Sequence, residues 1–494
     1  MVITSQQKIY GLYLLFFLIG IFSLDNFFTV WYDETYYAEI AYQAVSGNGL
    51  INKCDLFTYS EGQQIHGQGF VYLMLTGISI WFAGLSPFSF RLVNYLAYFI
   101  LVVLLGERFG KNKPLAFTVV FVIALFCENN GFTNAFTGRM ESLALLFTVI
   151  AYTLYLKNDR PYKPYLIGII TTLALLTTVR SFFLFIPMAW LLASDLFKSD
   201  HWKQSLKTGG TILLTVFTWI QFSFGSVTEF YRFYFQNTTL VDGELTLFEQ
   251  FVSFDNLLLT NKLKIALYVI LLLSFLLPKA VPEKHKPTVR IYSIVSFIFL
   301  IIIKDEGSYF ALVSPLIMYC IFTNIYYSNF RLKKAFLVAV LVFNVSLLSL
   351  KYFNNMTSDY RDSSVISEMV NQSIPENSNV ISAFCTYYAL REKNRNMYYL
   401  HMGGKSPEMR INYLIENTDP QYLITLIGDP LLSHFEKRFN CEIMAKYPEK
   451  NSTRSRLKDW ELGNFFNLDY QGLCIFKLNK KLDDNAISSK EFKR

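Results

Sequence analysis

Charged side chains are scarce in this chain. Only 17% of its 494 residues are charged, against about 25% in ordinary soluble domains, whereas 52% are hydrophobic. The mean hydropathy is +0.29. This shortage of charge excludes an ordinary soluble globular protein. The net charge of +7 does not indicate a nucleic-acid partner, because the basic residues stand in short clusters between apolar runs.

Cysteine is also scarce, and the sequence lacks both a cysteine metal motif and a signal-peptide cleavage site. The six cysteines form no Cys-x-x-Cys motif, which argues against a zinc site or a thioredoxin-like redox site. Cys441 and Cys474 leave two possibilities open, a disulfide in an oxidising compartment or two free thiols. The apolar N-terminal segment lacks a small-residue cleavage site, so we interpret it as an uncleaved first span.

Long apolar runs dominate what is present. A helix needs about 20 apolar residues to cross a bilayer, and backbone polar groups in lipid must be satisfied within the segment, so such runs form helices. We therefore expect an α-helical polytopic membrane protein of about 11 transmembrane helices. The runs lie at 9–24, 88–106, 114–127, 143–156, 164–179, 181–197, 209–224, 263–277, 289–303, 309–327 and 335–350.

A further apolar run, 70–83, is interpreted by charge. If the N-terminus is cytoplasmic and 70–83 does not cross, every basic loop falls on the cytoplasmic side, in agreement with the positive-inside rule. The run 70–83 is then an interfacial helix, and the C-terminus lies outside. We expect a bacterial inner membrane protein in contact with membrane lipids. The basic loops are 106–113, 157–163, 198–207, 278–290 and 328–334.

The composition changes after residue 351. The last part is polar and holds short β-rich runs, NVISAF, QYLITLI, CEIMAKY and GLCIFKL, and the segment from 363 is typical of a helix, a turn and a strand. We therefore expect a transmembrane domain at 1–351 and a small extracytoplasmic α/β domain at 352–494 with a frayed tail.

One stretch just after the first span could carry chemistry. In WYDETYYAEIAYQAVSGNGL, Asp33 and Glu34 open a helix that Gly47 and Gly49 end. At the interface, such carboxylates can meet a substrate whose tail is in lipid and whose head is in water. Alternatively, they only cap and charge-match the helix N-terminus.

Other ionisable residues lie at the ends of spans on the same predicted side. Arg139 and Glu141 stand at the fourth span, as a site, a buried pair or a solvated boundary pair. Arg180 lies between two runs with no loop, where it either holds a lipid-linked phosphate or snorkels to headgroups. His66 can bind metal or phosphate, or neither, and Tyr309 follows an acidic stretch.

These motifs resemble the GT-C glycosyltransferases, above all family 39, with the protein O-mannosyltransferases and the bacterial aminoarabinose transferases. The most specific likeness is DETYYAEIA, and the resemblance covers roughly residues 9–350. The chain departs from it with HGQG, where relatives have a Lys-Pro-Pro-Leu-like stretch, and with Glu141, where relatives often have Asp. The motifs lie at 33–41, 86–94, 138–143 and 308–310, with Pro315.

The resemblance implies transfer of a sugar from a polyprenyl-phosphate donor to a glycan, lipid or protein acceptor, with inversion. It implies that Asp33 is the base, and that Glu34 or Glu141 orients it or binds metal. Arg139 and Arg180, together with His66 and Tyr309, would bind the donor phosphate. A divalent ion would be held by Glu34 and His66.

Two rival classes remain. A transporter or flippase usually carries ionisable residues in mid-span or shows inverted repeats, and the sequence has no paired repeat. A lipid-linked oligosaccharide ligase or polymerase typically has a long external loop rich in basic residues. In the interior of the loop 225–262 the only basic residue of the sequence is Arg232, which favours the transferase.

Overall fold

The computed structural model describes most of the chain, and its contacts divide the chain into two compact units. The helical unit comprises Met1–Leu24, His66–Ser79 and Arg91–Leu350. The sheet unit comprises Asp25–Ile65, Ile80–Phe90 and Lys351–Arg494. The described residues are 4–25, 32–55, 69–111, 113–156, 161–197, 201–232, 262–277, 281–302, 309–329, 331–356, 363–393, 395–400, 407–427, 429–446 and 473–480.

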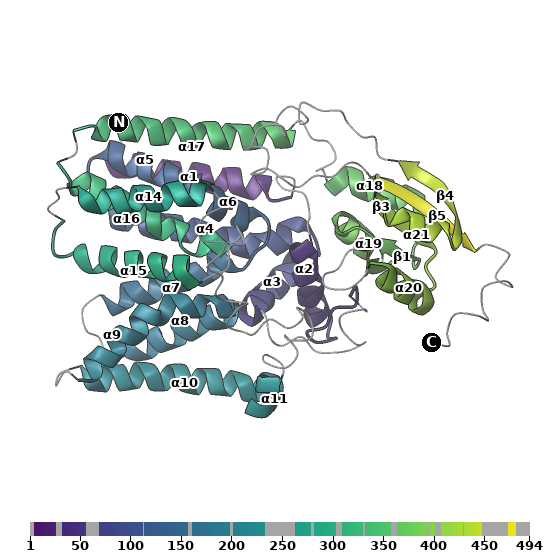
Figure 1. The fold of residues 1–494 in the computed structure, drawn as a ribbon, viewed down its shortest axis with the longest axis horizontal. Coiled ribbons are helices and arrows are strands. Elements are labelled where there is room, and N and C mark those ends of the chain that lie inside the picture. Colours follow the sequence, from purple (N-terminus) through teal and green to yellow (C-terminus); the bar gives the residue numbers. More distant parts are fainter. Residues whose placement is uncertain are drawn as a thin grey trace. The chain divides into compact units, whose positions relative to one another are not determined.

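Helices lying side by side make up the helical unit (Figure 1). Each of the apolar runs found in the sequence overlaps a helix, and two of these runs open with a 3-10 segment, η1 and η4. The elements are α1 (Ser5–Ser23), α3 (Phe70–Ala83), α4 (Pro87–Gly110), α5 (Leu115–Phe126), α6 (Asn129–Phe136), α7 (Glu141–Tyr155), α8 (Lys163–Thr177), η1 (Val179–Phe185), α9 (Ile186–Leu196), α10 (Trp202–Phe224), α11 (Val227–Tyr231), α14 (Lys262–Leu276), α15 (Lys286–Ile302), η4 (Tyr309–Leu312), α16 (Ser314–Tyr327) and α17 (Lys333–Met356).

Proline and glycine mark several helix ends. Helices α8, α9 and α16 each carry a proline in the first turn, where the missing N–H has no helical partner to lose. Helix α10 ends at Gly225, whose φ of 72° is the left-handed conformation that glycine adopts without a steric penalty. These signals explain why the apolar runs break where they do.

Helix length separates the long spans from the short ones. Among the described helices, Gln6–Ser23 and Pro87–Gly110 are long and apolar enough to cross a membrane alone. Leu115–Phe126 and Asn130–Phe136 pass the same test together, with a bend of 54° between them. Other apolar helices, such as α7 and α8 with 15 residues each, are about 22 Å long.

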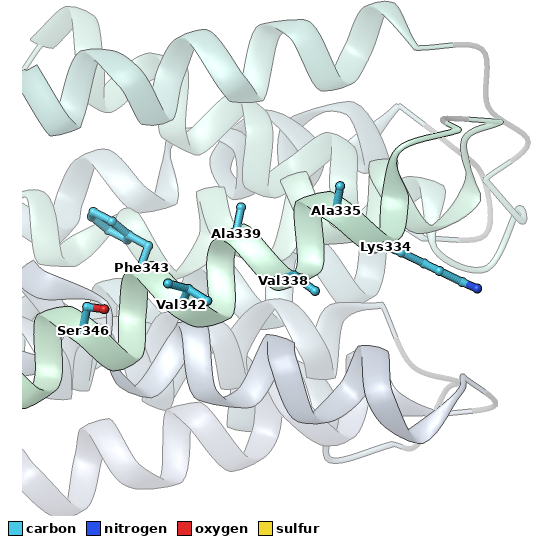
Figure 2. Close-up of a pocket in the computed structure, with 7 residues that line it drawn as sticks. All are labelled: Lys334, Ala335, Val338, Ala339, Val342, Phe343 and Ser346. Carbon is cyan, nitrogen blue, oxygen red and sulfur yellow. The ribbon is translucent and has the colours of Figure 1, made fainter.

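Helix α17 presents an open hollow of about 770 Å³ along one face (Figure 2). Its walls are mostly aliphatic, and Val338 and Val342 are 60% and 58% exposed. No acid lines it, so this hollow is not a candidate for proton-transfer chemistry. Lys334 lies at one end of it (Figure 2).

The sheet unit is a mixed five-stranded sheet with helices. The strand order is β2-β1-β3-β5-β4; β1 is parallel to β2 and β3, and β5 is antiparallel to β3 and β4. Its core includes Ile381, Leu423 and Phe435, all fully buried. The elements are α2 (Tyr32–Val45), α18 (Ser363–Ser373), β1 (Asn379–Ser382), η6 (Phe384–Thr386), α19 (Tyr387–Glu392), β2 (Asn396–Tyr399), α20 (Pro407–Thr418), β3 (Tyr422–Leu426), α21 (Leu432–Glu436), β4 (Phe439–Lys446) and β5 (Leu473–Lys480).

Strand register decides between the two possibilities for Cys441 and Cys474. Cys441 lies opposite Leu478, and Cys474 lies opposite Lys446, so the two cysteines are four positions out of register. At about 3.3 Å per residue this offset exceeds the Cα separation that a disulfide allows. Both are therefore free thiols.

Candidate functional site

A glycine turn places Arg139 and Glu141 in the helical unit. The chain leaves α6 and passes through Gly138, whose φ of 65° is left-handed, and α7 begins at Glu141. The hydroxyl of Tyr72 donates to the carbonyl oxygen of Gly138 at 2.6 Å, which links this turn to α3. The turn therefore sets Arg139 next to the N-terminus of α7.

Arg139 and Glu141 form a buried ion pair. Nη2 and Nε of Arg139 lie 3.4 Å from Oε1 and Oε2 of Glu141, respectively. Asn134 donates from Nδ2 to Oε2 of Glu141 at 2.9 Å. The two ionic residues are only 8% and 2% exposed, so the interpretation as a solvated boundary pair is wrong. Burial of this kind requires the charges to be paired.

Tyr309 brings the second arginine to the same place. The guanidinium carbon of Arg180 lies 3.4 Å from the centroid of the Tyr309 ring, and that of Arg139 lies 5.2 Å from it. Both distances are within the range of cation–π attraction. The ring itself is 7% exposed. The structure thus brings together four of the residues that the sequence singled out, from η1, η4, and the turn before α7.

A buried acid that the sequence analysis missed supports this region. Glu128 caps α6 by accepting from the backbone N–H groups of Asn130 at 3.1 Å and Gly131 at 2.6 Å. It also accepts from the hydroxyl of Ser314 at 2.7 Å, which ties α6 to the start of α16. An acid that directly follows an apolar run and precedes a short helix is an N-cap signal, and it could have revealed this residue.

Asp33 and Glu34 lie in the sheet unit, in the first turn of α2. Glu34 is fully buried, and its Oε1 accepts from the hydroxyl of Tyr388 in α19 at 3.1 Å. Asp33 is partly exposed. The predicted helix and its glycine stop are confirmed, since α2 ends at Val45 and both Gly47 and Gly49 have a φ of 82°. The two acids therefore differ in their burial, since Glu34 is fully buried and Asp33 is partly exposed.

A second carboxylate on α2 is neutralised by α19. Oε1 and Oε2 of Glu39 accept from Nη2 and Nε of Arg391 at 2.6 and 3.0 Å, and Oε2 also accepts from the Tyr387 hydroxyl at 2.9 Å. Arg391 further donates to Sγ of Cys54 at 3.2 Å. Burial raises the pKa of the Cys54 thiol, although the Arg391 charge opposes the shift. This network fixes α2 to the C-terminal part of the sheet unit.

Glu39 belongs to the motif DETYYAEIA, but its partners lie far from it in the sequence. Arg391 is 352 residues away from Glu39, and Tyr387 is 348 residues away. No local pattern connects residues at that separation.

The predicted metal ligands are tested only in part. His66 lies outside the described residues. In the part of the chain that the structure describes, no three side chains of His, Cys, Asp or Glu gather as a metal site. One oxygen of Glu34 is engaged by Tyr388. Metal binding by Glu34 and His66 stays a prediction, as does the convergence of Asp33 with the arginines.

Comparison with known proteins gives the fold. No family model and no curated protein matches the sequence. Crystal structures of ArnT from Cupriavidus metallidurans match it at 12% identity and a TM-score of 0.59 in the apo state, covering 96% of this chain and 98% of ArnT. The ArnT structure with undecaprenyl phosphate bound matches at 11% identity and a TM-score of 0.60, covering 95% of this chain and 98% of ArnT. The archaeal oligosaccharyltransferase AglB from Archaeoglobus fulgidus matches at 12% identity over 97% of this chain and 75% of its own, but a TM-score of 0.47 is too low to assign a fold. The chain is a membrane protein with the GT-C fold of ArnT, as the motif at 33–41 predicts.

Proposed function

We propose that this protein is a glycosyltransferase that moves a sugar from a polyprenyl-phosphate donor to a hydroxyl or amine of a glycan, lipid or protein. The observation that carries the proposal is the placement of Arg139 and Arg180 on the ring of Tyr309. They share this ring in a chain with the fold of ArnT, a protein crystallised with undecaprenyl phosphate. A transporter or a ligase has no comparable support from a described contact.

The two arginines suit the phosphate of such a donor. A guanidinium offers several N–H donors in a plane and binds phosphate oxygens in pairs. Arg180 is partly exposed and has no acidic partner among the residues that the structure describes. Arg139 is oriented by Glu141, and both guanidinium groups lie within cation–π range of the Tyr309 ring. In this proposal Glu141 positions Arg139 and does not touch the sugar.

Asp33 takes the part of the general base. The acceptor oxygen or nitrogen forms a bond to the anomeric carbon as its proton passes to the Asp33 carboxylate. The bond from that carbon to the phosphate oxygen breaks, and its electron pair leaves with the lipid phosphate, where the arginine charges stabilise it. Attack opposite the leaving group inverts the anomeric centre. No step here goes through a metal ion.

The proposed location follows from charge. With the basic loops in the cytoplasm, the N-terminus is cytoplasmic and the sheet unit faces outward, at a bacterial inner membrane. A lipid-linked sugar would then react on the extracytoplasmic side, where Asp33 follows the first span. The sugar is a hexose or a pentose carried by the lipid phosphate.

Lipid profiling of a deletion strain tests this function whichever sugar the donor carries. We expect one polyprenyl-phosphate sugar to accumulate when the gene is removed, and to return to its normal level when the gene is restored. Asp33→Asn should fail to restore it, because loss of a general base lowers turnover about 10²- to 10⁴-fold.

Three results would count against the proposal: no accumulated lipid-linked sugar, full restoration by Asp33→Asn, or accumulation confined to the cytoplasmic leaflet, which would indicate a flippase. Immunoblots of membranes confirm that each variant is inserted. Ser433→Ala, an exposed substitution in α21, serves as a matched control and should restore the wild-type lipid profile.

A further inference from the structure

A group of basic side chains lies at one end of the helical unit, away from the arginines on Tyr309 in sequence. Lys113 precedes α5, Lys284 and His285 precede α15, and Lys333 begins α17. In Figure 1 the N-terminal ends of α5, α15 and α17 are at the same, left-hand end of the helical unit. We call these four residues the basic cluster. The proposed glycosyl transfer uses none of them.

Two tyrosines at the end of α16 tie the basic cluster together. Nζ of Lys113 lies 5.3 Å from the ring centroid of Tyr326 and 5.4 Å from that of Tyr327. Lys333 donates from Nζ to the carbonyl oxygen of Tyr326 at 3.0 Å. The imidazole of His285 lies 5.7 Å from the ring of Tyr327. Three separate segments therefore bring two lysines and a histidine to one small region.

Among the described residues, no ion pair joins an acid to Lys113, Lys284 or Lys333. Arg108 donates to the hydroxyls of Thr153 at 2.9 Å and Thr288 at 2.5 Å, and its charge helps to lower the pKa of His285. The acid next to the cluster in sequence, Glu283, forms an ion pair with Lys286. Like charges held this close repel one another, so an anion would stabilise them.

His285 is buried beside these positive charges, and they change its pKa. It is 7% exposed, and no hydrogen-bond partner for its Nε2 is present among the described residues. Burial and the charges of Lys113, Lys284 and Arg108 lower the pKa of His285 to about 4, and burial and Lys284 lower the pKa of Lys113 to about 8. An unpartnered buried nitrogen beside crowded cations is what a site for an anionic ligand would leave without its ligand.

The hollow along α17 begins beside the basic cluster. Lys334 lines its end and follows Lys333 in the chain, and its other walls are mostly apolar, including Val338, Val342 and Phe343 (Figure 2). A ligand that is anionic at its head and aliphatic in its tail would match both features. Soluble anions match only the first.

We propose that the basic cluster binds the headgroup phosphate of an anionic phospholipid, with an acyl chain of the same lipid in the hollow of α17. Basic pockets between membrane helices bind such headgroups elsewhere. The site is separate from the arginines on Tyr309, and the proposal does not depend on the sugar-transfer function. In this proposal the protein binds anionic lipid selectively, on the face with the basic loops.

Lipid titration of the purified full-length chain tests the proposal. The apparent affinity for phosphatidylglycerol is measured in neutral detergent by native mass spectrometry, with phosphatidylcholine as the neutral comparison. We expect saturable binding of phosphatidylglycerol only, and a loss of about 30-fold in affinity for Lys113→Gln with Lys333→Gln, from two lysines near the phosphate.

A matched control removes two charges from the same end of the helical unit. Lys203→Gln with Lys207→Gln changes two lysines of α10 that also lie over aromatic rings, Trp202 and Tyr165. This control should bind phosphatidylglycerol as the wild type does. An equal loss in both double variants would overturn the proposal in favour of diffuse surface charge.

Further arms address the tail and the identity of the lipid. Val338→Asp, on the exposed wall of the hollow, should weaken phosphatidylglycerol binding with the cluster intact. The proposal fails if inorganic phosphate at millimolar concentration competes fully, or if undecaprenyl phosphate binds at this site and phosphatidylglycerol does not. Circular dichroism and gel filtration check folding, and His285→Gln supplies a second cluster variant that retains every lysine.

Discussion

Among the residues that the structure describes, two buried carboxylates are paired with arginine, and the geometry of the pairs differs. Arg391 holds Glu39 with two short hydrogen bonds, at 2.6 and 3.0 Å. The two contacts between Arg139 and Glu141 are longer, at 3.4 Å each. Since hydrogen bonds weaken with distance, the contacts between Arg139 and Glu141 are the weaker ones. We infer that the first pair is structural and that the second is suited to binding.

A second question about single residues is whether the ring of Tyr309 holds both arginines in place. Tyr309→Leu removes the ring under Arg180 and Arg139, and we expect the Kd for undecaprenyl phosphate to rise about 3- to 30-fold, since a cation–π contact is worth about 0.5–2 kcal/mol. Tyr309→Phe keeps the ring and should stay within about threefold of the wild type. Equal weakening by both variants would indicate that the hydroxyl, not the ring, is responsible.

The reactivity of Cys54 follows from its surroundings. It is 1% exposed and its pKa is raised by burial, so at pH 7–8 it remains a protonated thiol, whereas the thiolate is the reactive form. Maleimide labelling with peptide mapping should modify the more exposed Cys441 about tenfold faster or more. Raising the pH to 8 should not close this gap, because the shift is upward. Rapid labelling of Cys54 in the folded protein would contradict its burial.

Single residues were predictable where an ionisable group stood in apolar sequence. Arg139, Glu141 and Arg180 were found because a charge at the end of a span needs a reason. Their common neighbour Tyr309 was found through a family motif and its position after an acidic stretch. Tyr388 could not be found, because a tyrosine in a polar segment carries no signal until folding brings it to Glu34.

At the scale of elements, the turn between α6 and α7 depends on one glycine. Gly138 has a φ of 65°, a conformation that costs about 1–2 kcal/mol with a side chain. Gly138→Ala should lower the unfolding free energy by about that amount and weaken undecaprenyl phosphate binding by displacing Arg139. Gly209→Ala, in the middle of α10 with open space around it, is the matched control and should raise stability by up to about 1 kcal/mol. A neutral Gly138→Ala, measured by denaturant unfolding in detergent, would show that the turn adapts.

The attachment of α2 to α19 is a second test between elements. Removing one partner of a buried ion pair costs about 3–5 kcal/mol because the other charge stays buried. We expect this for Arg391→Met and for Glu39→Gln, and a double variant less unstable than the sum by about 0.5–3 kcal/mol. Pulse proteolysis in urea supplies the values.

The control cycle uses Lys393 and Glu376, an ion pair at 3.8 Å whose side chains are 44% and 65% exposed. Exposed pairs contribute about 0–1 kcal/mol. Additive effects in the Arg391 cycle, as in this control, would mean that the two helices are not coupled by the pair.

Elements were predicted well where composition alone decides them. Apolar runs became helices because lipid leaves no other way to satisfy the backbone, and short β-rich runs such as those of β3 and β5 became strands. The short helix α6 was missed because its sequence, NNGFTNAF, has only eight residues, too few for a clear apolar run, and depends on the Glu128 cap. The four-residue strand β2 was also missed.

At the scale of the whole molecule, helix length bears on how the chain crosses the membrane. Helix α3 has 14 residues and is about 21 Å long, against about 30 Å of hydrocarbon. Its last residues, Trp81 and Phe82, are 69% and 76% exposed, which is typical of aromatic side chains at headgroup depth. Several of the expected spans are equally short, so length does not separate them from α3. The side on which the basic loops lie does separate them, because one additional crossing reverses every later loop.

The number of crossings therefore predicts where the two ends of the chain lie. Eleven crossings place them on opposite sides of the membrane, and a crossing by α3 would place them on the same side. With reporters fused in a bacterial host, we expect fluorescence from green fluorescent protein at the N-terminus and activity from alkaline phosphatase at the C-terminus. A reporter placed in the basic stretch 331–334 should behave like the one at the N-terminus. A bright C-terminal green fluorescent protein together with an inactive phosphatase would mean that α3 crosses the membrane or that another expected span does not. The side of the membrane on which Asp33 meets the lipid-linked donor would then have to be determined by reporters within the chain.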